Sequence, residues 1–555
     1  MKYIHSKLDI AAAGSLILLA VIFISACGGR AAATDVIETA QATAITPSTS
    51  TVVLPSSTVT ASPTSTPAQP TAKATLTPTP KPPADTPTAA SPSATSVSPT
   101  LSPFATAGAT GDASAESLAA AGVEVYDTTI TLPTYPIRDY LVEQIDPIYN
   151  MPVYYFNRAE FEAANPTPTP IEYSGVVLEN PYLRLTFLPE LGGRLYSAVI
   201  KHVDQEIFYH NPVVKPSRYG ILQPYEANWW LAAGGMDWAY PTQEHGYRFG
   251  IPWKYTVTHH AGGATITLSD TAPDRIGLEV SVTLPSDGAS FSVAPKLSNN
   301  APNTVPVQLW VNAALALAPG SMSPRTQFIV PSEVITIHSR GEQGWSLPGE
   351  REQSLWPVVG QTDLTEYNQW ANYLGFFAPN QTTPFVAAYN PDTDLGIVRL
   401  APPATAKGGS SKLFAFGSDF PDRSYTDNDS QYFEIWGGAN AGFWPEDDIA
   451  VPAGGALGWQ EQWRPLAGLG GLTWATEDVA IHLSQNGERY RLSAIASRPI
   501  QGQVHVSTLN GILIDETFAA RPDTALRWNW TEISEPVRVE FLDNTGAVLL
   551  EYTTD

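Results

Sequence analysis

Apolar and polar residues alternate along most of the chain beyond about residue 123, in short runs separated by segments rich in Gly, Pro, Asn and Asp. Alternation with a period of two is typical of a β-strand that buries one face, and no long helical pattern lies between the runs. This spacing predicts an all-β fold built as a sandwich or barrel. The predicted strands are 182–188, 264–268, 277–284, 305–317, 333–338, 373–378, 385–389, 396–400, 413–416 and 431–436.

The strand pattern divides the folded part of the chain into two units. We expect a large unit over residues 123–466 and a smaller accessory unit over residues 467–555. In the smaller unit, the Asn-Gly pairs at 486–487 and 510–511 are turn signals between alternating runs, which is typical of β-hairpins. We interpret this unit as an immunoglobulin-like β-sandwich.

Residues 1–122, which precede these units, differ from them in composition. Residues 1–26 resemble a bacterial lipoprotein signal peptide, because Lys2 and Lys7 precede an apolar run and Ile-Ser-Ala-Cys follows it. An uncleaved membrane anchor is the alternative. Cys27 is the only cysteine, so a lipid anchor on it leaves no thiol for a disulfide or a thiolate metal site. Residues 27–122 are dominated by Thr, Pro, Ser and Ala, which predicts a disordered stalk.

Composition and charge restrict the partners. The chain has 555 residues, of which 43% are hydrophobic, so there is ample material for a large core. Its formal net charge is -24, with 54 acidic residues against 30 Lys and Arg. Such a chain is repelled by polyanions, so we expect no nucleic acid partner. Lipidated Cys27 predicts anchoring to the bacterial cell membrane, with the remainder facing outside the cytoplasm.

The predicted strand at 431–436 has two chemically different faces. Successive residues of a strand point to opposite sides, so Phe433 and Ile435 share one face. Tyr432, Glu434 and Trp436 share the other. This second face therefore combines a carboxylate with aromatic rings.

Two other strands repeat this combination. Trp310 and Asn312 share a face of the strand at 305–317, and Trp459, Glu461 and Trp463 share a face further along. Sugar recognition needs aromatic rings for the C–H faces of a pyranose and polar groups for its hydroxyls. Tryptophans are also common core residues, but all 15 lie after residue 228, several beside an acidic or amide residue.

The segment Asn180–Gly246 adds further candidates. An alternating strand runs into a Gly-Gly-Arg turn, and a second glycine turn is expected to present Asp237, Trp238 and His245 together. We expect this segment to form the end of a sheet that carries sugar-binding side chains.

Several distinctive motifs follow one another along the chain: PYLRLTFLPELGGRLYS, GGMDWAYP, LWVNAALAL, FIVPSEVITIH, LWP, KLFAFG and YFEIWGG. They resemble those of the DUF5107 family, which belongs to the galactose mutarotase-like group. The resemblance covers about residues 129–465 and implies a β-supersandwich with a sugar site on its concave face. The chain departs from the family pattern at Asp237, where Glu is usual, and at Ala239, where a polar residue is usual.

The resemblance also implies acid–base chemistry at a sugar anomeric carbon. Glu434 is the expected general base, His245 the preferred acid and His338 the second candidate, with Asp237 beside them. A structural role remains the alternative for Glu434, His245 and His338, and Asp237 is also expected to position hydroxyl groups of the sugar. The side chains expected to bind the sugar are Arg194, Trp238, Trp310, Asn312, Tyr432, Trp436 and Glu461.

Three functions remain open at this stage. The first is a carbohydrate-active enzyme, either an aldose epimerase or a glycan-cleaving enzyme that uses carboxylates among Asp237, Glu434 and Glu461. The second is a noncatalytic glycan-binding lipoprotein, and the third is a structural protein of the cell envelope. The chain contains no HExxH, G-x-S-x-G or Walker motif, and we expect no metal and no cofactor. Glycan recognition is the favoured interpretation.

Overall fold

The computed structural model describes residues 122–217, 226–342, 344–379, 383, 385–402, 408–416, 426–531 and 536–554. The predicted signal peptide, the lipidated Cys27 and the stalk lie outside the described residues. Within the described ranges, helices are few and short, and none is long and apolar enough to cross a membrane. The all-β prediction is confirmed.

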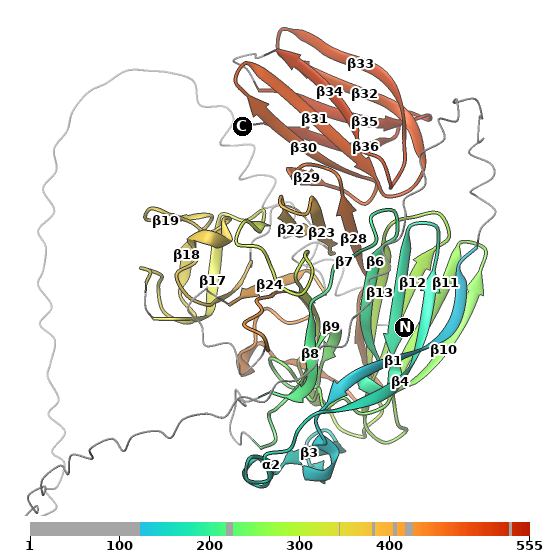
Figure 1. Ribbon diagram of the computed structural model, residues 1–555, viewed down its shortest axis with the longest axis vertical. Coiled ribbons are helices and arrows are strands. Elements are labelled where there is room, and N and C mark those ends of the chain that lie inside the picture. Colours follow the sequence, from blue (N-terminus) through green and yellow to red (C-terminus); the bar gives the residue numbers. More distant parts are fainter. Residues whose placement is uncertain are drawn as a thin grey trace, which may run out of the picture. The chain divides into compact units, whose positions relative to one another are not determined.

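Two large sheets form most of the described structure, and their strands are antiparallel except where β1 pairs with β8 (Figure 1). The larger sheet carries the candidate site, and among the described residues it has thirteen strands. In order across the sheet they are β18 (Gln353–Leu355), β17 (Val334–Arg340), β21 (Leu374–Phe377), β24 (Ser410–Ala415), β25 (Phe433–Gly438), β15 (Trp310–Leu315), β9 (Leu231–Ala239), β8 (His210–Pro216), β1 (Glu124–Thr134), β4 (Thr169–Glu179), β5 (Leu183–Leu188), β6 (Arg194–Ile200) and β7 (Gln205–Glu206).

The second sheet packs its apolar face against the first. One buried cluster contains Val311 and Ile435 from the larger sheet together with Val280 and Ile397 from the second. The second sheet runs in the order β10 (Lys254–His260), β11 (Gly263–Asp270), β12 (Ile276–Pro285), β13 (Phe291–Asn299), β28 (Glu461–Ala467), β23 (Leu395–Leu400), β22 (Phe385–Asn390) and β16 (Gln327–Ile329), and β27 (Ala456–Gly458) pairs with β13.

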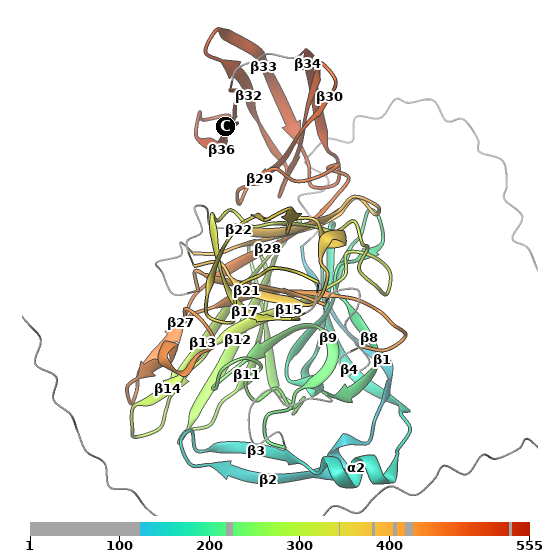
Figure 2. The same cartoon turned by 90° about the vertical axis from the view of Figure 1, so that its left-hand side faces the viewer.

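Smaller elements complete this part of the chain. The hairpin of β2 (Leu141–Asp146) and β3 (Met151–Phe156) leads into a short helix, α2 (Arg158–Ala164) (Figure 2). The Asn157 side chain caps α2 by accepting a hydrogen bond from the Glu160 amide. Two further short pairs are β14 (Val305–Val307) with β26 (Ile449–Val451), and β19 (Val358–Val359) with β20 (Thr362–Asp363).

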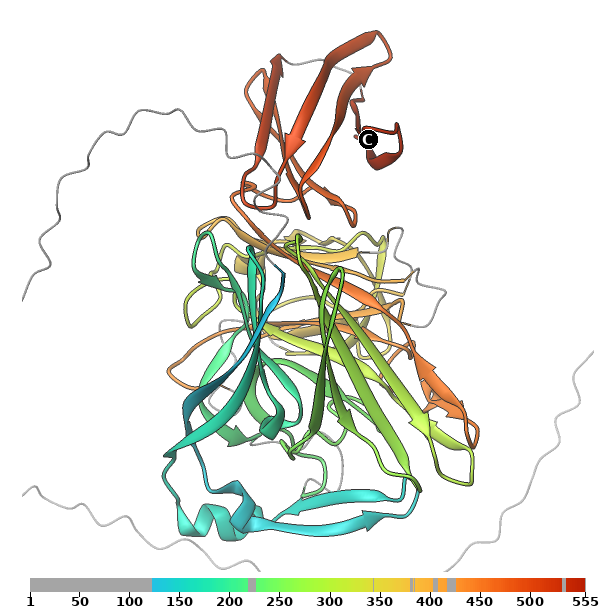
Figure 3. The ribbon, with the colours of Figure 1, turned by 90° about the vertical axis from the view of Figure 1, so that its right-hand side faces the viewer.

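The C-terminal strands form a small β-sandwich of two four-stranded sheets (Figure 3). Ile481 from one sheet and Val504 and Phe541 from the other lie in one shared apolar cluster. The Asn-Gly turns are confirmed, between β30 and β31 and between β32 and β33. The sheets are β29 (Trp474–Ala475), β30 (Val479–Asn486), β31 (Arg489–Ala496) and β34 (Leu526–Thr531); and β33 (Gly511–Ala520), β32 (Ile500–Thr508), β35 (Arg538–Asp543) and β36 (Val548–Thr553).

Two local expectations are wrong. The single strand predicted at 305–317 is divided into β14 and β15, which pair with different partners. The second glycine turn is also absent, because Gly234 and Gly235 lie inside β9 with φ of 89° and 73°. A Cβ at Gly234 would lie 2.0 Å from the carbonyl oxygen of Tyr209. These glycines therefore permit close approach of neighbouring strands and a positive φ, rather than a chain reversal.

Candidate functional site

A row of functional side chains crosses the larger sheet. Asp237 of β9 is directly opposite Asn312 of β15, Asn312 is opposite Trp436 of β25, and Trp436 is opposite Lys412 of β24. Residues directly opposite one another in antiparallel strands share a face of the sheet. Four strands thus bring an acid, an amide, an indole and an ammonium group onto one face, opposite the face that packs against the second sheet.

A cavity of about 320 Å³ lies over this face of the sheet. Glu434, His245 and His338, three of the four residues expected to be catalytic, line it together. Its full lining is Trp230, Glu244, His245, His338, Ser339, Glu350, Tyr373, Lys412, Phe414, Phe416, Tyr432, Glu434 and Phe443. Residues far apart in the sequence therefore converge on one hollow with polar and aromatic walls.

Glu434 is the carboxylate of this cavity with the most defined surroundings. The residue is 5% exposed. Its Oε2 accepts a hydrogen bond from Trp436 Nε1 at 2.8 Å, and its Oε1 accepts from Tyr432 Oη at 3.2 Å and from Asn312 Nδ2 at 3.4 Å. These donors hold the carboxylate in one orientation, with lone pairs remaining for a ligand.

Lys412 is a candidate functional residue that the sequence patterns did not indicate. Its Nζ lies 4.6 Å from the ring centroid of Trp436 and 4.8 Å from that of Phe443, and it makes no hydrogen bond or ion pair with another described residue. Burial lowers the pKa of Lys412 to about 8, against the opposing influence of the Glu434 and Glu244 carboxylates. A buried ammonium without an acceptor is costly, so a ligand oxygen is the expected partner.

His245 belongs to the loop between β9 and β10. Its ring stacks on Trp230 with centroids 3.8 Å apart, and its Nδ1 contacts the Arg248 guanidinium. The next residue, Gly246, has φ of 55°, and a Cβ there would lie 2.3 Å from the backbone nitrogen of Tyr240. Only glycine fits this tight part of the loop, which sets the position of His245.

His338, at the far end of β17, has both ring nitrogens close to protein groups. Its Nε2 lies 3.3 Å from Glu244 Oε1, and its Nδ1 lies 3.2 Å from Ser339 Oγ. Burial lowers the pKa of His338, although the hydrogen bond with Glu244 opposes this shift. His338 is therefore less free than His245 to contact a ligand through a ring nitrogen.

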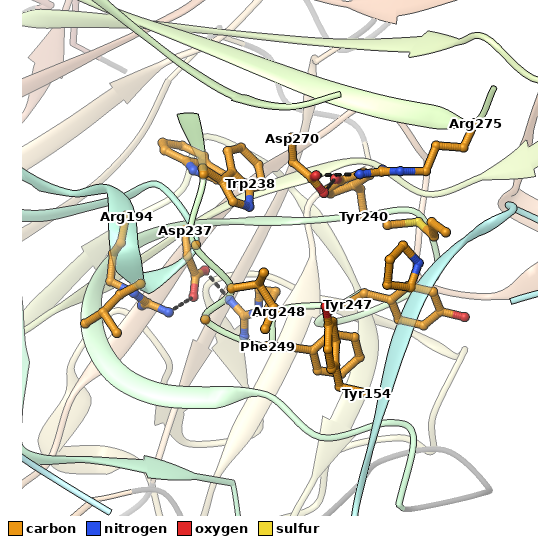
Figure 4. Close-up of a pocket in the computed structure, with 17 residues that line it drawn as sticks. Tyr154, Arg194, Asp237, Trp238, Tyr240, Tyr247, Arg248, Phe249, Asp270 and Arg275 are labelled. Atoms are coloured by element: carbon orange, nitrogen blue, oxygen red, sulfur yellow. Dashed lines mark hydrogen bonds and ion pairs between the residues drawn. The ribbon is translucent and has the colours of Figure 1, made fainter. Parts of the chain in front are cut away.

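Asp237 and Arg194 do not line the cavity of about 320 Å³, which is called the larger cavity below. They form a buried ion cluster with Arg248 (Figure 4). Asp237 Oδ2 lies 2.9 Å from Arg194 Nη2, and its Oδ1 accepts a hydrogen bond from Arg248. The cluster borders a small cavity of about 70 Å³. Another, of about 30 Å³, is lined by both Asp237 and Glu434, so the ion cluster is adjacent to the main site.

Five other expected sugar-binding residues, Trp238, Trp310, Asn312, Trp436 and Glu461, do not line the cavity of about 320 Å³. Trp238 follows Asp237 in β9 and so points into the core, where its Nε1 donates to the Gly193 carbonyl at 3.0 Å. Trp310 is fully buried, and Trp436 lies beneath Lys412. Glu461 lies on the other sheet. Of the expected binding residues, Tyr432 lines the cavity of about 320 Å³, and Arg194, Asn312 and Tyr432 line the cavity of about 30 Å³.

Both carboxylate oxygens of Glu461 accept hydrogen bonds from neighbouring side chains. Its carboxylate lies 2.6 Å from the Arg399 guanidinium, and both side chains have zero exposed surface. Trp459 and Trp463 each donate an indole N–H to it at 2.8 Å. The predicted shared face of these residues therefore builds a structural ion pair. Among the described residues, no group of three or more His, Cys, Asp and Glu is placed to hold a metal ion.

The fold and the cavity define an all-β protein that gathers a carboxylate, two imidazoles, an ammonium and aromatic rings on one face of a large antiparallel sheet. A family of the description "Domain of unknown function (DUF5107)" matches residues 149–449. The chain belongs to this family, as the sequence motifs predicted.

Solved structures that align with the chain include several proteins of bacterial origin. A TPR-domain containing protein from Parabacteroides distasonis is 20% identical, with a TM-score of 0.49. The alignment covers 62% of this chain and 55% of that one. This chain therefore spans little more than half of that protein's length. A putative aldose 1-epimerase from Klebsiella pneumoniae is 12% identical, with 62% and 92% covered and a TM-score of 0.38. A galactose mutarotase related enzyme from Lactobacillus acidophilus is 11% identical, with 53% and 97% covered and a TM-score of 0.36.

Proposed function

We propose that this protein binds carbohydrate in the cavity of about 320 Å³ and transfers protons at the anomeric carbon of the bound sugar. The observation that carries the proposal is the convergence of Glu434, His245 and Lys412 in one hollow with aromatic walls. This volume lies at the lower end of the range for small-ligand sites, about 300 to 1,000 Å³, and suits a single pyranose unit.

The lining supplies both kinds of contact that a sugar requires. Trp230, Tyr432 and Phe443 offer ring surfaces for the C–H faces of a pyranose. Lys412 offers hydrogen-bond donors that have no acceptor among the described residues, and Glu434 offers acceptors for hydroxyl groups. Polar groups convergent on an apolar hollow are the usual arrangement of a binding site for a small polar molecule.

The proposed chemistry needs no group besides the sugar and the protein. The Glu434 carboxylate takes the proton of the anomeric hydroxyl, the bond between C1 and the ring oxygen breaks, and the negative charge that develops on the ring oxygen is stabilised by a hydrogen bond from the His245 side chain. Reclosure from either face of the aldehyde gives either anomer, and Glu434 returns its proton to the anomeric oxygen. The reducing end of a glycan provides the necessary hydroxyl.

This function is tested with the purified full-length protein in detergent on an array of neutral and charged glycans. We expect binding above background and, for the bound sugar, faster exchange between anomers measured by NMR. Glu434→Gln should retain binding and lower the exchange rate by about 10²- to 10⁴-fold, because the amide cannot accept the proton.

Glu279→Gln, on β12 of the other sheet, is the matched control and should leave both properties unchanged. An array without any bound glycan would refute the whole proposal. Binding without faster exchange would instead leave a noncatalytic glycan-binding protein, and exchange that is unchanged in Glu434→Gln would remove Glu434 as the base.

The proposal places the protein at the outer face of the bacterial cell membrane, anchored by lipidated Cys27. The support is the lipobox-like sequence that ends at Cys27 and the long Thr/Pro/Ser-rich segment that follows it. Cell fractionation should find the wild type with the membrane and Cys27→Ser, which cannot be acylated at this position, either in the soluble fraction or as an unprocessed precursor. A Cys27→Ser protein that is processed and membrane-bound as efficiently as the wild type would contradict the anchor.

A further inference from the structure

Arg248 joins the buried ion cluster to the larger cavity. Its side chain is 4% exposed, and it contacts Asp237 through Nη1 and His245 Nδ1 through Nη2. Asp237 is itself held by Arg194, whose Nη1 donates to the Gly234 carbonyl at 2.6 Å. The Arg248 guanidinium, which contacts His245, is therefore held in place by the buried Asp237 carboxylate. Figure 4 shows the contacts among Arg194, Asp237 and Arg248.

The contact decides which nitrogen of His245 carries the proton. A guanidinium has only N–H donors and stays charged at any pH that a folded protein experiences. The atom that receives its N–H must offer a lone pair, so Nδ1 of His245 is unprotonated. A neutral imidazole has one N–H, which then lies on Nε2.

The other charged groups around His245 favour the same neutral form. Burial, followed by the positive charges of Arg248 and Lys412 and by His338, places the pKa of His245 well below its usual value. Glu244 beside it in the loop, Glu434 on β25 and Glu350 are the carboxylates that line the same cavity, and Asp237 contacts Arg248 on the side away from His245. Among the described residues, none of these carboxylates is hydrogen-bonded to the His245 ring, whose contact is with Arg248.

We propose that Arg248 is a positioning residue that holds His245 as a neutral hydrogen-bond donor, with its proton on Nε2 directed to the sugar. Trp230 fixes the plane of the ring by stacking at an interplanar angle of 17°. The role at the sugar rests on the proposed function. Within it, His245 stabilises negative charge on the ring oxygen by donating a hydrogen bond, instead of acting as an imidazolium acid.

The proposal is tested by NMR of the full-length protein labelled with ¹⁵N-histidine. In the wild type we expect the His245 ring, assigned through its loss in His245→Gln, to show protonated Nε2 and unprotonated Nδ1 from pH 5 to pH 8. In Arg248→Met the ring should populate both tautomers and titrate nearer to the usual histidine pKa. Asp237→Asn keeps the guanidinium donor, so the tautomer should persist there.

The wild-type spectrum decides the matter even if Arg248→Met fails to fold. A proton on Nδ1, or an imidazolium formed above pH 6, would overturn the proposal, and so would an unchanged tautomer and pKa in a folded Arg248→Met. Because these readouts need no sugar, they are independent of the glycan array. A fixed Nε2–H tautomer together with an empty array would refute the proposed function and leave the positioning by Arg248 intact.

Discussion

Replacement of Lys412 by methionine is expected to weaken sugar binding by about 10- to 100-fold and to raise the free energy of unfolding at neutral pH. The loss of binding follows from removal of a charged donor, since a hydrogen bond to a charged group contributes about 1.5–3 kcal/mol. The gain in stability follows because the ammonium is buried among Trp436, Phe414 and Phe443 with no acceptor in the described part of the chain, whereas methionine is compatible with the same aromatic surroundings.

The pH dependence of this gain has a definite sign. Burial lowers the pKa of Lys412 from 10.5 to about 8 in the folded protein, and this shift corresponds to roughly 3 kcal/mol as an upper limit. The cost of burying the charge is fully present below pH 8 and falls as the pH rises from 8 to 10.5, because the unfolded chain then binds more protons. The stability advantage of Lys412→Met should therefore shrink above pH 8.

Urea unfolding and glycan titration at pH 7 and at pH 9.5 measure both effects. Lys215→Met is the matched control, because Lys215 is also largely buried but lies 2.7 Å from Asp427 Oδ2 and donates to the Thr426 carbonyl. Its replacement should lower the free energy of unfolding by about 1–3 kcal/mol and spare sugar binding. If Lys412→Met destabilises the protein as Lys215→Met does, Lys412 has a structural role and the functional assignment fails.

A second large effect is expected in the other sheet, where Glu461→Gln should lower the free energy of unfolding by about 3–5 kcal/mol. The substitution leaves the Arg399 guanidinium buried without its counter-charge, at a site where both side chains are fully enclosed. It also replaces one of the oxygens that accept hydrogen bonds from Trp459 and Trp463 by an amide nitrogen, which cannot accept them.

Tryptophan fluorescence during urea unfolding measures this loss directly, and Glu434→Gln is the informative comparison. Both glutamates accept indole N–H groups, but Glu434 has no arginine partner within 4 Å among the described residues. Its replacement should cost much less stability and should act on the sugar reaction instead. Equal destabilisation by the two substitutions would remove this distinction between a structural and a functional carboxylate.

The two faces of β25 are those that the alternation of residues in its sequence predicts. Phe433 and Ile435 do lie in the main core, while Tyr432 and Trp436 pack on the opposite side of β25. This works because the alternation of side chains is a local property of extended backbone. The same rule, applied to β9, would have separated Trp238 from Asp237 had the glycines before them been recognised as part of a strand.

Other features depended on contacts between distant segments. Lys412 has no distinctive sequence context, and only the register of β24 against β25 places it over Trp436. Glu461 and Glu434 have the same local pattern of flanking aromatic residues, yet Arg399 neutralises only the first. A local pattern cannot reveal such a partner, because the arginine comes from a neighbouring strand of the folded sheet.

The sequence by itself determined the all-β class, the approximate positions of about ten strands, the buried side of β15 and β25 and membership of the DUF5107 family, since these follow from local periodicity and from ordered motifs. Only the tertiary structure determines which polar residues contact one another. Strand register brings Lys412 to Glu434, and the loop after β9 brings His245 to Arg248. These contacts depend on pairing between strands that lie far apart in the sequence. They therefore cannot be predicted from the spacing of residues along the chain.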